Sequence, residues 1–461
     1  MDLSSILMID TIHLYNMIYK SVTELIGNTP LIEISKDITG LKNVKLYAKC
    51  ELYNPFGSLK DRAGYEMIKD DIESIKASGK TVIESSSGNT AKALDVICMM
   101  NDIPFITVTN RIKTEEVGKI LSVCGAKIKE LPGMSECPDP TDPNDPTTHI
   151  QKMISAEPDK YYYPNQYTNL KNPQAHYLHT GREIIEDLGQ VDYFFATLGT
   201  TGSSRGTIEC LQEHNPNLIK IGIIASKGDN IPGIRNIDEM YEVGIFDKSI
   251  YNEILSISSM DAIEGMLTLV RKCGILAGPT SGACYQRTIE YLKTIDDTLD
   301  KEINAVFIAC DRMEYYTSYI EKRRPDLFKD NVQGSGLFSM TDEDFAFAKE
   351  ITIDEYDNFV ATKEPLIVDL RGNMAFKNVH IKNSINITDV FFDDLVTNGL
   401  PFPKDKLVLL ICPTGDKSRK YSAYLNKNGL NVYSLKGGFN AYRLQNKELV
   451  REIRRIDFDA L

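Results

Sequence analysis

The sequence predicts an α/β protein with parallel sheets, divided into a larger N-terminal domain and a smaller C-terminal one. Strand and helix patterns alternate along most of the first 320 residues, which is typical of a parallel sheet. The composition then shifts at residues 323–345, and a second, smaller alternating unit follows. The chain has 461 residues, 42% of them hydrophobic and 25% charged, which is enough for more than one core.

The first domain is predicted to alternate from residue 58 onward. Ser58 caps a helix whose apolar positions run from Leu59 to Ile75, and Gly79 ends this helix or its extension. The segment 132–148, rich in proline and aspartate, is expected to be a loop. The other predicted elements are strands at 80–85, 104–108, 126–131, 191–197, 221–225 and 305–308, and helices from Asn89 and over 114–123.

The domain boundaries follow from the change in pattern. Residues 1–20 form an N-terminal extension, and the first domain covers 21–324. The motifs RRPD and QGSG punctuate a linker assigned to 325–348, and the second domain covers 349–455. Within it we expect strands at 366–370, 407–412 and 432–435 and a helix at 418–428.

Charge and cysteine content exclude several classes of protein. The net charge of -13 argues against a general binder of nucleic acid or anionic membranes. The short basic clusters Lys322–Arg324 and Arg451–Arg455 are expected to be solvated surface. Nine cysteines without a Cys-x-x-Cys pair indicate reduced thiols and no metal site. The N-terminus has no basic region of a signal peptide and no apolar run spans a membrane, so a cytoplasmic location is expected.

Three segments of the first domain carry chemistry. The segment NPFGSLKDR at 54–62 places Lys60 in the opening turn of a helix, where the positive helix end disfavours an ammonium. Such a lysine is easier to keep neutral, as Schiff-base formation requires. The segments SSSGNT at 85–90 and GTTGSSRG at 199–206 each lie between a strand and a helix, where backbone N–H groups bind anions. Alone, a lysine in this position is usually a solvated surface group, and each of the two loops fits a tight turn equally well.

Together and in this order, the three segments resemble the fold-type-II pyridoxal-phosphate enzymes, and within them the cysteine synthase and cystathionine β-synthase family. The resemblance covers most of residues 20–320 and includes IGNTPL at 26–31 and a stretch with Asn169, Asn172, Pro173 and His176. It implies two α/β subdomains with parallel sheets, pyridoxal 5'-phosphate as cofactor, an amino-acid substrate and a homodimer.

The resemblance also implies a role for each matching residue. Lys60 would form the imine with the cofactor and shuttle the α-proton, and Asn89 would hydrogen-bond the 3'-oxygen. Thr280, in GPTSG at 278–282, would face the pyridine nitrogen, with Ser281 as the alternative in a shifted register. A hydroxyl there leaves the nitrogen largely unprotonated, which suits expulsion of a β-substituent. The cofactor phosphate would be bound by Gly199, Thr200, Thr201, Gly202 and Ser203, and the substrate carboxylate by Ser86, Ser87, Thr90 and Gln166.

The segment IRNIDE at 234–239 indicates the leaving group. It resembles the branch of the family that uses O-phosphoserine, in which a matching arginine binds the substrate phosphate. A guanidinium fork suits a phosphate dianion, whereas a neutral acetyl ester gains little from it. We therefore expect Arg235 to bind the substrate phosphate, the other reading being a surface arginine in a loop. Enzymes of this branch can take sulfur from a thiocarboxylated carrier protein, which makes such a protein a candidate partner.

The C-terminal domain resembles a rhodanese domain over about 350–450. The resemblance rests on PLIVDLR at 365–371, VHI at 379–381, LLICPTGDKS at 409–418 and GGF at 437–439. Cys412 ends an apolar strand before a loop and a helix, and the N–H groups of such a loop favour a thiolate and a persulfide anion. Lys417 stands where the family often has arginine, so thiosulfate is in doubt as donor. Asp369 and Arg371 are expected to stabilise the domain.

The leading functional hypothesis is β-replacement on an activated serine. O-phosphoserine would lose phosphate to give an aminoacrylate, and sulfur would add to form cysteine or a cysteine-like product. Cys412 would relay the sulfur as a persulfide, directly or by way of a carrier protein. The alternatives are an amine nucleophile that gives a diaminopropionate-type product, cysteine degradation with sulfur trapping, and a C-terminal domain that only binds a partner.

Overall fold

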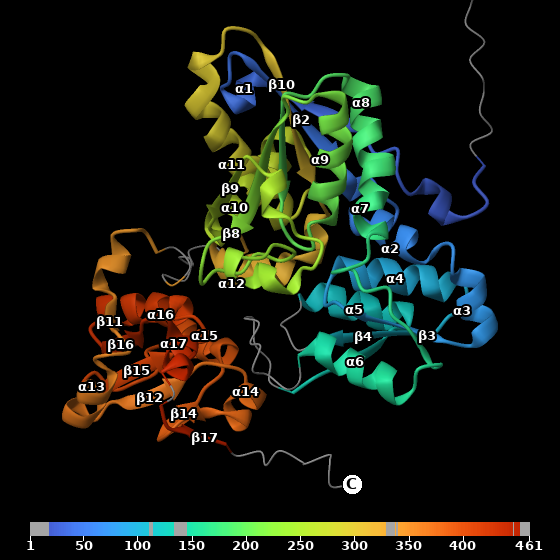
Figure 1. Cartoon of the computed structure of the whole chain (residues 1–461). Helices are drawn as coiled ribbons and strands as arrows, with labels where there is room; N and C mark the ends of the chain where they lie inside the picture. The colour runs from blue at the N-terminus through green and yellow to red at the C-terminus, as the bar shows by residue number, and fades with distance from the viewer. Residues whose placement is uncertain are drawn as a thin grey trace, which may run out of the picture.

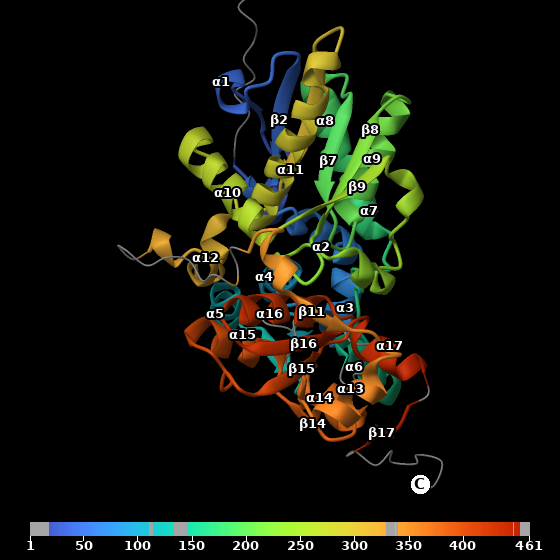
Figure 2. The same ribbon diagram turned by 90° about the vertical axis from the view of Figure 1, so that its left-hand side faces the viewer.

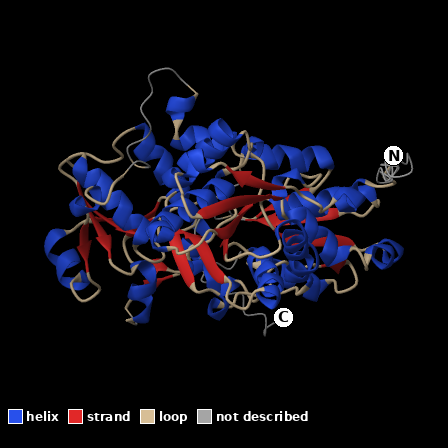
Figure 3. Ribbon diagram, turned by 90° about the horizontal axis from the view of Figure 1, so that it is seen from above, coloured by secondary structure: helices blue, strands red, loops and turns tan. Residues whose placement is uncertain are grey.

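The computed structural model describes residues 18–109, 114–132, 145–328, 337, 340–445 and 447–451. Within these ranges the chain forms three α/β units, each around its own sheet (Figure 1). Two units share the first domain, and the third, orange to red in the figure, is the C-terminal domain. Seen from above, the strands lie between layers of helices (Figure 3).

The first unit contains a six-stranded sheet. All neighbouring strands pair in parallel except the first two, which are antiparallel. The strand order is β1 (Leu31–Ile34), β2 (Val44–Cys50), β10 (Ile303–Ala309), β7 (Tyr193–Thr197), β8 (Ile219–Ala225) and β9 (Glu253–Ile257).

Helices cover both faces of this sheet, because its strands send alternate apolar side chains to opposite sides. One core contains residues of α10 (Ser259–Cys273) and α11 (Pro279–Ile295). The opposite core contains residues of α8 (Arg182–Leu188) and α9 (Gly202–His214). The remaining helices of the unit are α1 (Lys36–Thr39), α7 (Lys171–Ala175), the π-helical turn η4 (His176–Gly181) and α12 (Thr317–Arg323).

The second unit contains a four-stranded parallel sheet. Its strand order is β5 (Lys127–Glu130), β4 (Phe105–Thr109), β3 (Thr81–Ser85) and β6 (Tyr161–Tyr162). One face packs on α2 (Lys60–Ile68), α3 (Ile72–Ser78), α4 (Asn89–Met100) and α5 (Glu115–Cys124), and the other on α6 (Pro146–Ala156). Helices α2 and α4 begin at the cleft between the two units.

The C-terminal domain has a five-stranded parallel sheet and a short antiparallel pair. The larger sheet runs β11 (Lys349–Ile351), β16 (Asn431–Leu435), β15 (Leu407–Ile411), β12 (Leu366–Asp369) and β14 (Ser384–Asn386); the pair is β13 (His380–Ile381) and β17 (Leu449–Val450). One face carries α15 (Asp389–Asn398) and α16 (Asp416–Lys427). The other carries α13 (Tyr356–Lys363) and α17 (Gly438–Leu444), next to α14 (Asn373–Asn378).

Short 3-10 helices complete the description. They are η2 (Val22–Leu25), η3 (Glu51–Tyr53), η5 (Ile237–Glu242), η6 (Lys248–Ile250), η7 (Asp296–Thr298), η8 (Met313–Tyr315), η9 (Pro325–Leu327) and η10 (Asp344–Phe347). In the described part of the chain, the helices are too short or too polar to cross a membrane.

Two predicted elements were wrong in detail. The helix expected from Ser58 to Gly79 is two helices, α2 and α3, with Asp71 as the N-cap of the second. Tyr162 donates to the Asp71 carboxylate (2.7 Å), a tertiary contact that the apolar pattern does not reveal. The loop predicted over 132–148 ends earlier than expected, since α6 begins at Pro146 with Asp145 as its cap. Residues 133–144, the motif QGSG and most of the N-terminal extension lie outside the described residues.

Candidate active site

Lys60 is the first residue of α2, and the preceding turn fixes its position. The Ser58 hydroxyl accepts from the Lys60 amide (3.2 Å), and the Phe56 amide donates to Asp61 (2.6 Å). The Lys60 side chain is partly buried, and its amine donates to Thr200 Oγ1 (3.2 Å). The structure thus brings the predicted imine-forming lysine next to the predicted phosphate loop.

Burial lowers the pKa of Lys60 to about 8, although Cys310 and Asp311 oppose part of the change. From the sequence, the positive end of the helix was expected to lower the pKa of Lys60. The structure instead gives the loss of water contact as the largest cause. A substantial share of neutral amine near pH 8 suits both nucleophilic attack and proton abstraction.

The serine-rich loop after β3 forms one polar patch with Gln166. Thr90 Oγ1 donates to Gln166 Oε1 (2.7 Å), and Gln166 Nε2 donates to the Ser85 carbonyl (3.0 Å). The Ser86 hydroxyl accepts from the amides of Gly88 (3.3 Å) and Ala91 (3.2 Å), so its proton is oriented by the start of α4. Ser86, Ser87, Thr90 and Gln166, the four residues expected to hold a carboxylate, all line one cavity.

Asn89 lies in a buried polar cluster that the sequence did not predict. Its Nδ2 donates to Asp311 (2.8 Å) and to the Tyr316 hydroxyl (2.9 Å), and Tyr316 donates to Asp311. Burial raises the pKa of Asp311 to about 6, while Tyr316 and Lys92 oppose the change. No motif marked Asp311 or Tyr316, because they follow β10, more than 200 residues from Asn89 in the sequence.

The loop from Gly199 to Ser203 leads into the N-terminus of α9. Thr201 has a positive φ of 63° at the N-cap, a left-handed conformation. A Cβ on Gly199 would lie 2.4 Å from the Gly233 carbonyl oxygen, and one on Gly202 would lie 2.0 Å from Asn172 Oδ1. Both glycines are therefore required by protein packing around the loop, in addition to any close approach of a phosphate.

Thr280 and Ser281 both lie at the start of α11, and their hydroxyls have different partners. Thr280 donates to the Pro232 carbonyl. Ser281 accepts from the amides of Cys310 (2.7 Å) and Asp311 (3.4 Å), at the end of β10. Neither residue lines the cavity in this conformation, so the choice between them for the pyridine nitrogen stays a prediction.

Arg235 is buried in the wall of the cavity and does not lie on the surface. Its Nη1 donates to the Glu239 carbonyl (3.2 Å), and its guanidinium lies 5.2 Å from the ring centre of Tyr167. Asn236 and Glu239 form a capping box, which fixes the segment that follows Arg235. The sequence predicted Arg235 but not the rigid setting that this box provides.

One cavity of about 920 Å³ collects most of the predicted site residues. It also reaches the C-terminal domain, which sequence reasoning did not foresee. Its predicted lining residues are Lys60, Ser86, Ser87, Asn89, Thr90, Gln166, Gly199, Thr200 and Arg235; its C-terminal lining residues are Pro413, Thr414, Asp416, Lys417, Gly437 and Asn440. Thr201, Gly202 and Ser203 continue the loop behind Thr200 and do not line the cavity.

Cys412 lies directly behind the cavity wall, next to the lining residues Pro413 and Thr414. Its Sγ accepts from Gly415 N (3.1 Å), Ser418 N (3.4 Å) and Ser418 Oγ (3.4 Å), as the loop pattern predicted. The expected net effect was nevertheless wrong. Burial raises the pKa of Cys412 and outweighs these donors, so the free cysteine is favoured as a thiol.

Lys417 and Arg371 each form a buried ion pair in the C-terminal domain. Lys417 Nζ forms a buried ion pair with Asp389 (2.9 Å). Arg371 is fully buried, pairs with Asp369 (2.8 Å) and lies 3.3 Å from the ring centre of Phe439. The buried ion pair and the ring contact link the end of β12 to α17, an arrangement consistent with the stabilising role expected of Asp369 and Arg371.

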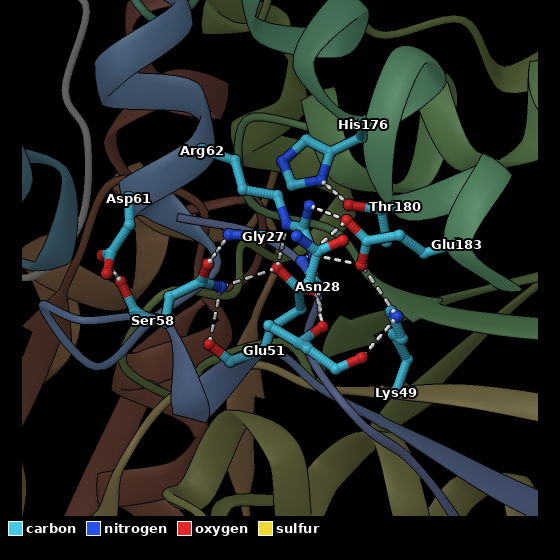
Figure 4. A network of polar contacts seen from close by, with 12 residues as sticks. Gly27, Asn28, Lys49, Glu51, Ser58, Asp61, Arg62, His176, Thr180 and Glu183 are labelled. Carbon is cyan, nitrogen blue, oxygen red and sulfur yellow. Dashed lines mark hydrogen bonds and ion pairs between the residues drawn. The ribbon is translucent and has the colours of Figure 1, made fainter. Parts of the chain in front are cut away.

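A network of polar side chains anchors α2 from below (Figure 4). Arg62, two residues after Lys60, donates to Glu51 (2.7 Å) and to Glu183 (2.6 Å). Lys49 pairs with Glu183 as well (2.9 Å). Burial would raise the pKa of Glu183, but Arg62 and Lys49 outweigh it and hold that pKa at about 2. The network fixes the helix that carries Lys60, the predicted imine-forming lysine.

The described residues fit a phosphorylated aldehyde cofactor. Asn89 Oδ1 and Thr201 Oγ1 are buried without a hydrogen-bond partner, the first at the start of α4 and the second at the N-cap of α9. Phosphate binds well at such a helix N-terminus. The Lys60 amine, whose pKa burial lowers to about 8, donates to Thr200, the neighbour of Thr201 in the chain. This combination of fold and site fits an enzyme with a phosphorylated aldehyde cofactor, for which Lys60 is the predicted attachment point.

Comparison with known proteins gives the family. The model described as "Pyridoxal-phosphate dependent enzyme" matches residues 22–311, and the model described as "Rhodanese-like domain" matches 352–445. The chain therefore belongs to the pyridoxal-phosphate-dependent enzymes, in the group of the cysteine synthases and cystathionine β-synthases, and carries a rhodanese-like domain. Its cofactor is pyridoxal 5'-phosphate.

Three relatives illustrate the similarity. The cysteine synthase of Aquifex aeolicus is 31% identical over 61% of this chain and 86% of its own length. A hydrogen sulfide-producing enzyme from Fusobacterium nucleatum is 29% identical, with a TM-score of 0.58, over 65% of this chain and 100% of its own. An O-acetylserine-dependent cystathionine β-synthase from Helicobacter pylori is 26% identical, with a TM-score of 0.56, over 66% and 98%.

Proposed function

We propose that this enzyme catalyses β-replacement on O-phosphoserine and forms cysteine with sulfur supplied through its rhodanese-like domain. The observation that supports this proposal most is the single cavity. It joins Lys60, the buried Arg235 and the polar patch expected to bind the substrate carboxylate, which consists of Ser86, Ser87, Thr90 and Gln166. When bound, pyridoxal phosphate supplies the electron sink that lets the α-proton and the β-substituent leave. The residues of the chain then have to bind and orient the substrate and to move protons.

Each group has a position that suits its task. The oriented hydroxyls and amides of Ser86, Ser87, Thr90 and Gln166 bind the substrate carboxylate. Lys60, whose pKa is about 8, takes the α-proton and returns it at the end of the cycle. Arg235 neutralises the phosphate ester before and during its departure, which a neutral acetyl ester does not need. Two chains of this kind are proposed to form a homodimer in the cytoplasm.

The test compares two substrates in wild type and in an arginine variant. Arg235→Gln is expected to raise the KM for O-phosphoserine by about 10- to 100-fold, the loss of one charge-assisted hydrogen-bond pair. Use of O-acetylserine should change little. Arg287→Gln, on α11 and outside the cavity lining, is the matched control. Wild-type enzyme that uses O-acetylserine well and O-phosphoserine poorly would contradict the proposed substrate.

Cysteine degradation is a second candidate, supported by the similarity to the hydrogen sulfide-producing enzyme from Fusobacterium nucleatum. In that reaction Cys412, held as a mixed disulfide with a low-molecular-weight thiol, would accept the released sulfide as a persulfide, and the thiol would leave. Incubation of the enzyme with cysteine alone separates the two functions. Sulfide release faster than cysteine synthesis from O-phosphoserine and sulfide would favour degradation.

A further inference from the structure

The rhodanese-like domain is docked on the loop that leads to Arg235. Gly228, in this loop, faces the start of α16 so closely that a Cβ there would lie 3.3 Å from Lys417 N. Asp229 lies 4.0 Å from Lys420 on the same helix. Burial would raise the pKa of Asp229, but Lys420 and Arg323 outweigh it and lower that pKa. A buried carboxylate of one domain is thus compensated by a cation of the other.

A second contact lies between α12 and α15. Lys322 pairs with Asp393 (3.2 Å) and Asp394 (3.1 Å) of the rhodanese-like domain. Lys322–Arg324 was predicted to be solvated surface, and this prediction was wrong. Arg323 is buried and donates to the Asn230 carbonyl (3.3 Å), while Lys322 bridges two domains. We name the ion pairs of Lys322 with Asp393 and Asp394 the latch.

A third contact is apolar. Met260, at the start of α10 in the first domain, packs against the hydrophobic core of the rhodanese-like domain. Figures 1 and 2 agree that α16 and α15 lie beside α12 and below the large sheet. Polar and apolar contacts together therefore hold the loop that follows Cys412 in the wall of the cavity.

We infer that sulfur passes from Cys412 to the substrate's β-carbon inside this one cavity, with no release to solvent. This inference rests on the proposed function. It names the persulfide of Cys412, in the same chain, as the sulfur donor. The loop from Gly228 to Arg235 contacts the rhodanese-like domain at one end and the substrate phosphate site at the other. A carrier protein would have to enter a cavity whose wall is already the Cys412 loop.

The transfer balances as follows. After phosphate has left with its bonding electrons, the terminal sulfur of the Cys412 persulfide anion forms a bond to the β-carbon. Lys60 returns the proton to the α-carbon, and the product is joined to Cys412 by a disulfide. Two equivalents of a low-molecular-weight thiol then reduce this bond. They leave as their own disulfide, and cysteine and the Cys412 thiol are released.

The test uses isotope retention in the full-length holoenzyme. Cys412 is loaded with ³⁴S from labelled polysulfide, freed of excess reagent and checked by intact mass against Cys412→Ser. O-phosphoserine, glutathione and about a tenfold excess of unlabelled sulfide over enzyme are then added, below the millimolar effective concentration of a tethered group. Mass spectrometry of the first-turnover cysteine gives the retained label.

Nearly complete label in the product supports transfer within the cavity. Dilution of the label to the composition of the bulk sulfide would overturn it, and so would a Cys412 that accepts no label. The proposed function fails in a different way, because no cysteine would then form from O-phosphoserine with any sulfur source. The two failures are therefore distinguishable.

The latch gives a variant series for the same measurement. Lys322→Glu should reduce retention toward the bulk ratio, and the additional change Asp394→Lys should restore part of it. Lys171→Glu is a matched control, since Lys171 also bridges two adjacent aspartates and its side chain is 32% exposed, against 31% for Lys322. Equal retention in Lys322→Glu and Lys171→Glu would show that the latch does not hold the cavity closed.

Discussion

If Lys60 is the residue that binds the cofactor, as we propose, its amine sets how readily the cofactor attaches. Because burial holds its pKa at about 8, the neutral form gains population as the pH rises through that value. We expect covalent attachment of pyridoxal phosphate to the apoprotein to accelerate about tenfold from pH 7 to pH 8.5 and then to level off. The rate can be followed by absorbance, with the modified residue identified after borohydride trapping. A rate that keeps rising to pH 10 would contradict the lowered pKa.

For Cys412 we expect no levelling off below pH 9, because burial raises the pKa of its thiol above the ordinary value of 9.0. Alkylation of Cys412 by iodoacetamide should therefore still be accelerating at pH 9, unlike that of a thiol activated for attack. Ser418→Ala removes one donor to Sγ and should slow alkylation at a given pH a few-fold. Peptide mass analysis reads the rate for Cys412 alone. Faster alkylation of Ser418→Ala would show that the hydroxyl shields the sulfur and does not stabilise its anion.

At the scale of elements, the position of α2 depends on Arg62. Its guanidinium compensates the buried carboxylates of Glu51 and Glu183, so Arg62→Met would leave two anions without their main partner. Removal of one member of a buried ion pair costs about 3–5 kcal/mol. Urea unfolding should show a loss of this size, and Arg205→Met, whose pair with Glu209 is partly exposed, should cost less than about 1 kcal/mol. Equal losses would mean that the network does not anchor the helix.

Much of the element order could be predicted from the sequence, because alternating short apolar runs and helical periods are local signals. The points at which a helix is interrupted could not be predicted in this way. At the interruption between α2 and α3, Asp71 accepts a hydrogen bond from Tyr162, which is distant in the sequence. The same holds for the site. Motifs revealed Lys60 and the loops around it, but the Asp311–Tyr316 pair behind Asn89 is created only when β10 is placed in the sheet.

The docking of the two domains belongs to the scale of the whole molecule, and the apolar contact of Met260 tests it separately from the latch. Met260→Glu places a carboxylate against the core of the rhodanese-like domain, at a cost of about 1–3 kcal/mol to the contact. Each domain has its own cores and should stay folded. We therefore expect unchanged circular dichroism but a larger radius of gyration in X-ray scattering.

The matched control is Met99→Glu, because Met99 is a methionine of α4 with 49% of its surface exposed. It should leave the scattering curve as in the wild type. The isotope experiment then links shape to chemistry, since an open chain exposes the Cys412 loop to bulk thiols and sulfide. The cysteine made by Met260→Glu should lose label in proportion to the increase in the radius of gyration. The cysteine made by Lys322→Glu should lose label as well, because a different contact between the domains is broken. Expansion with full retention would mean that sulfur reaches the β-carbon without a closed cavity, and the docked arrangement would then have another purpose.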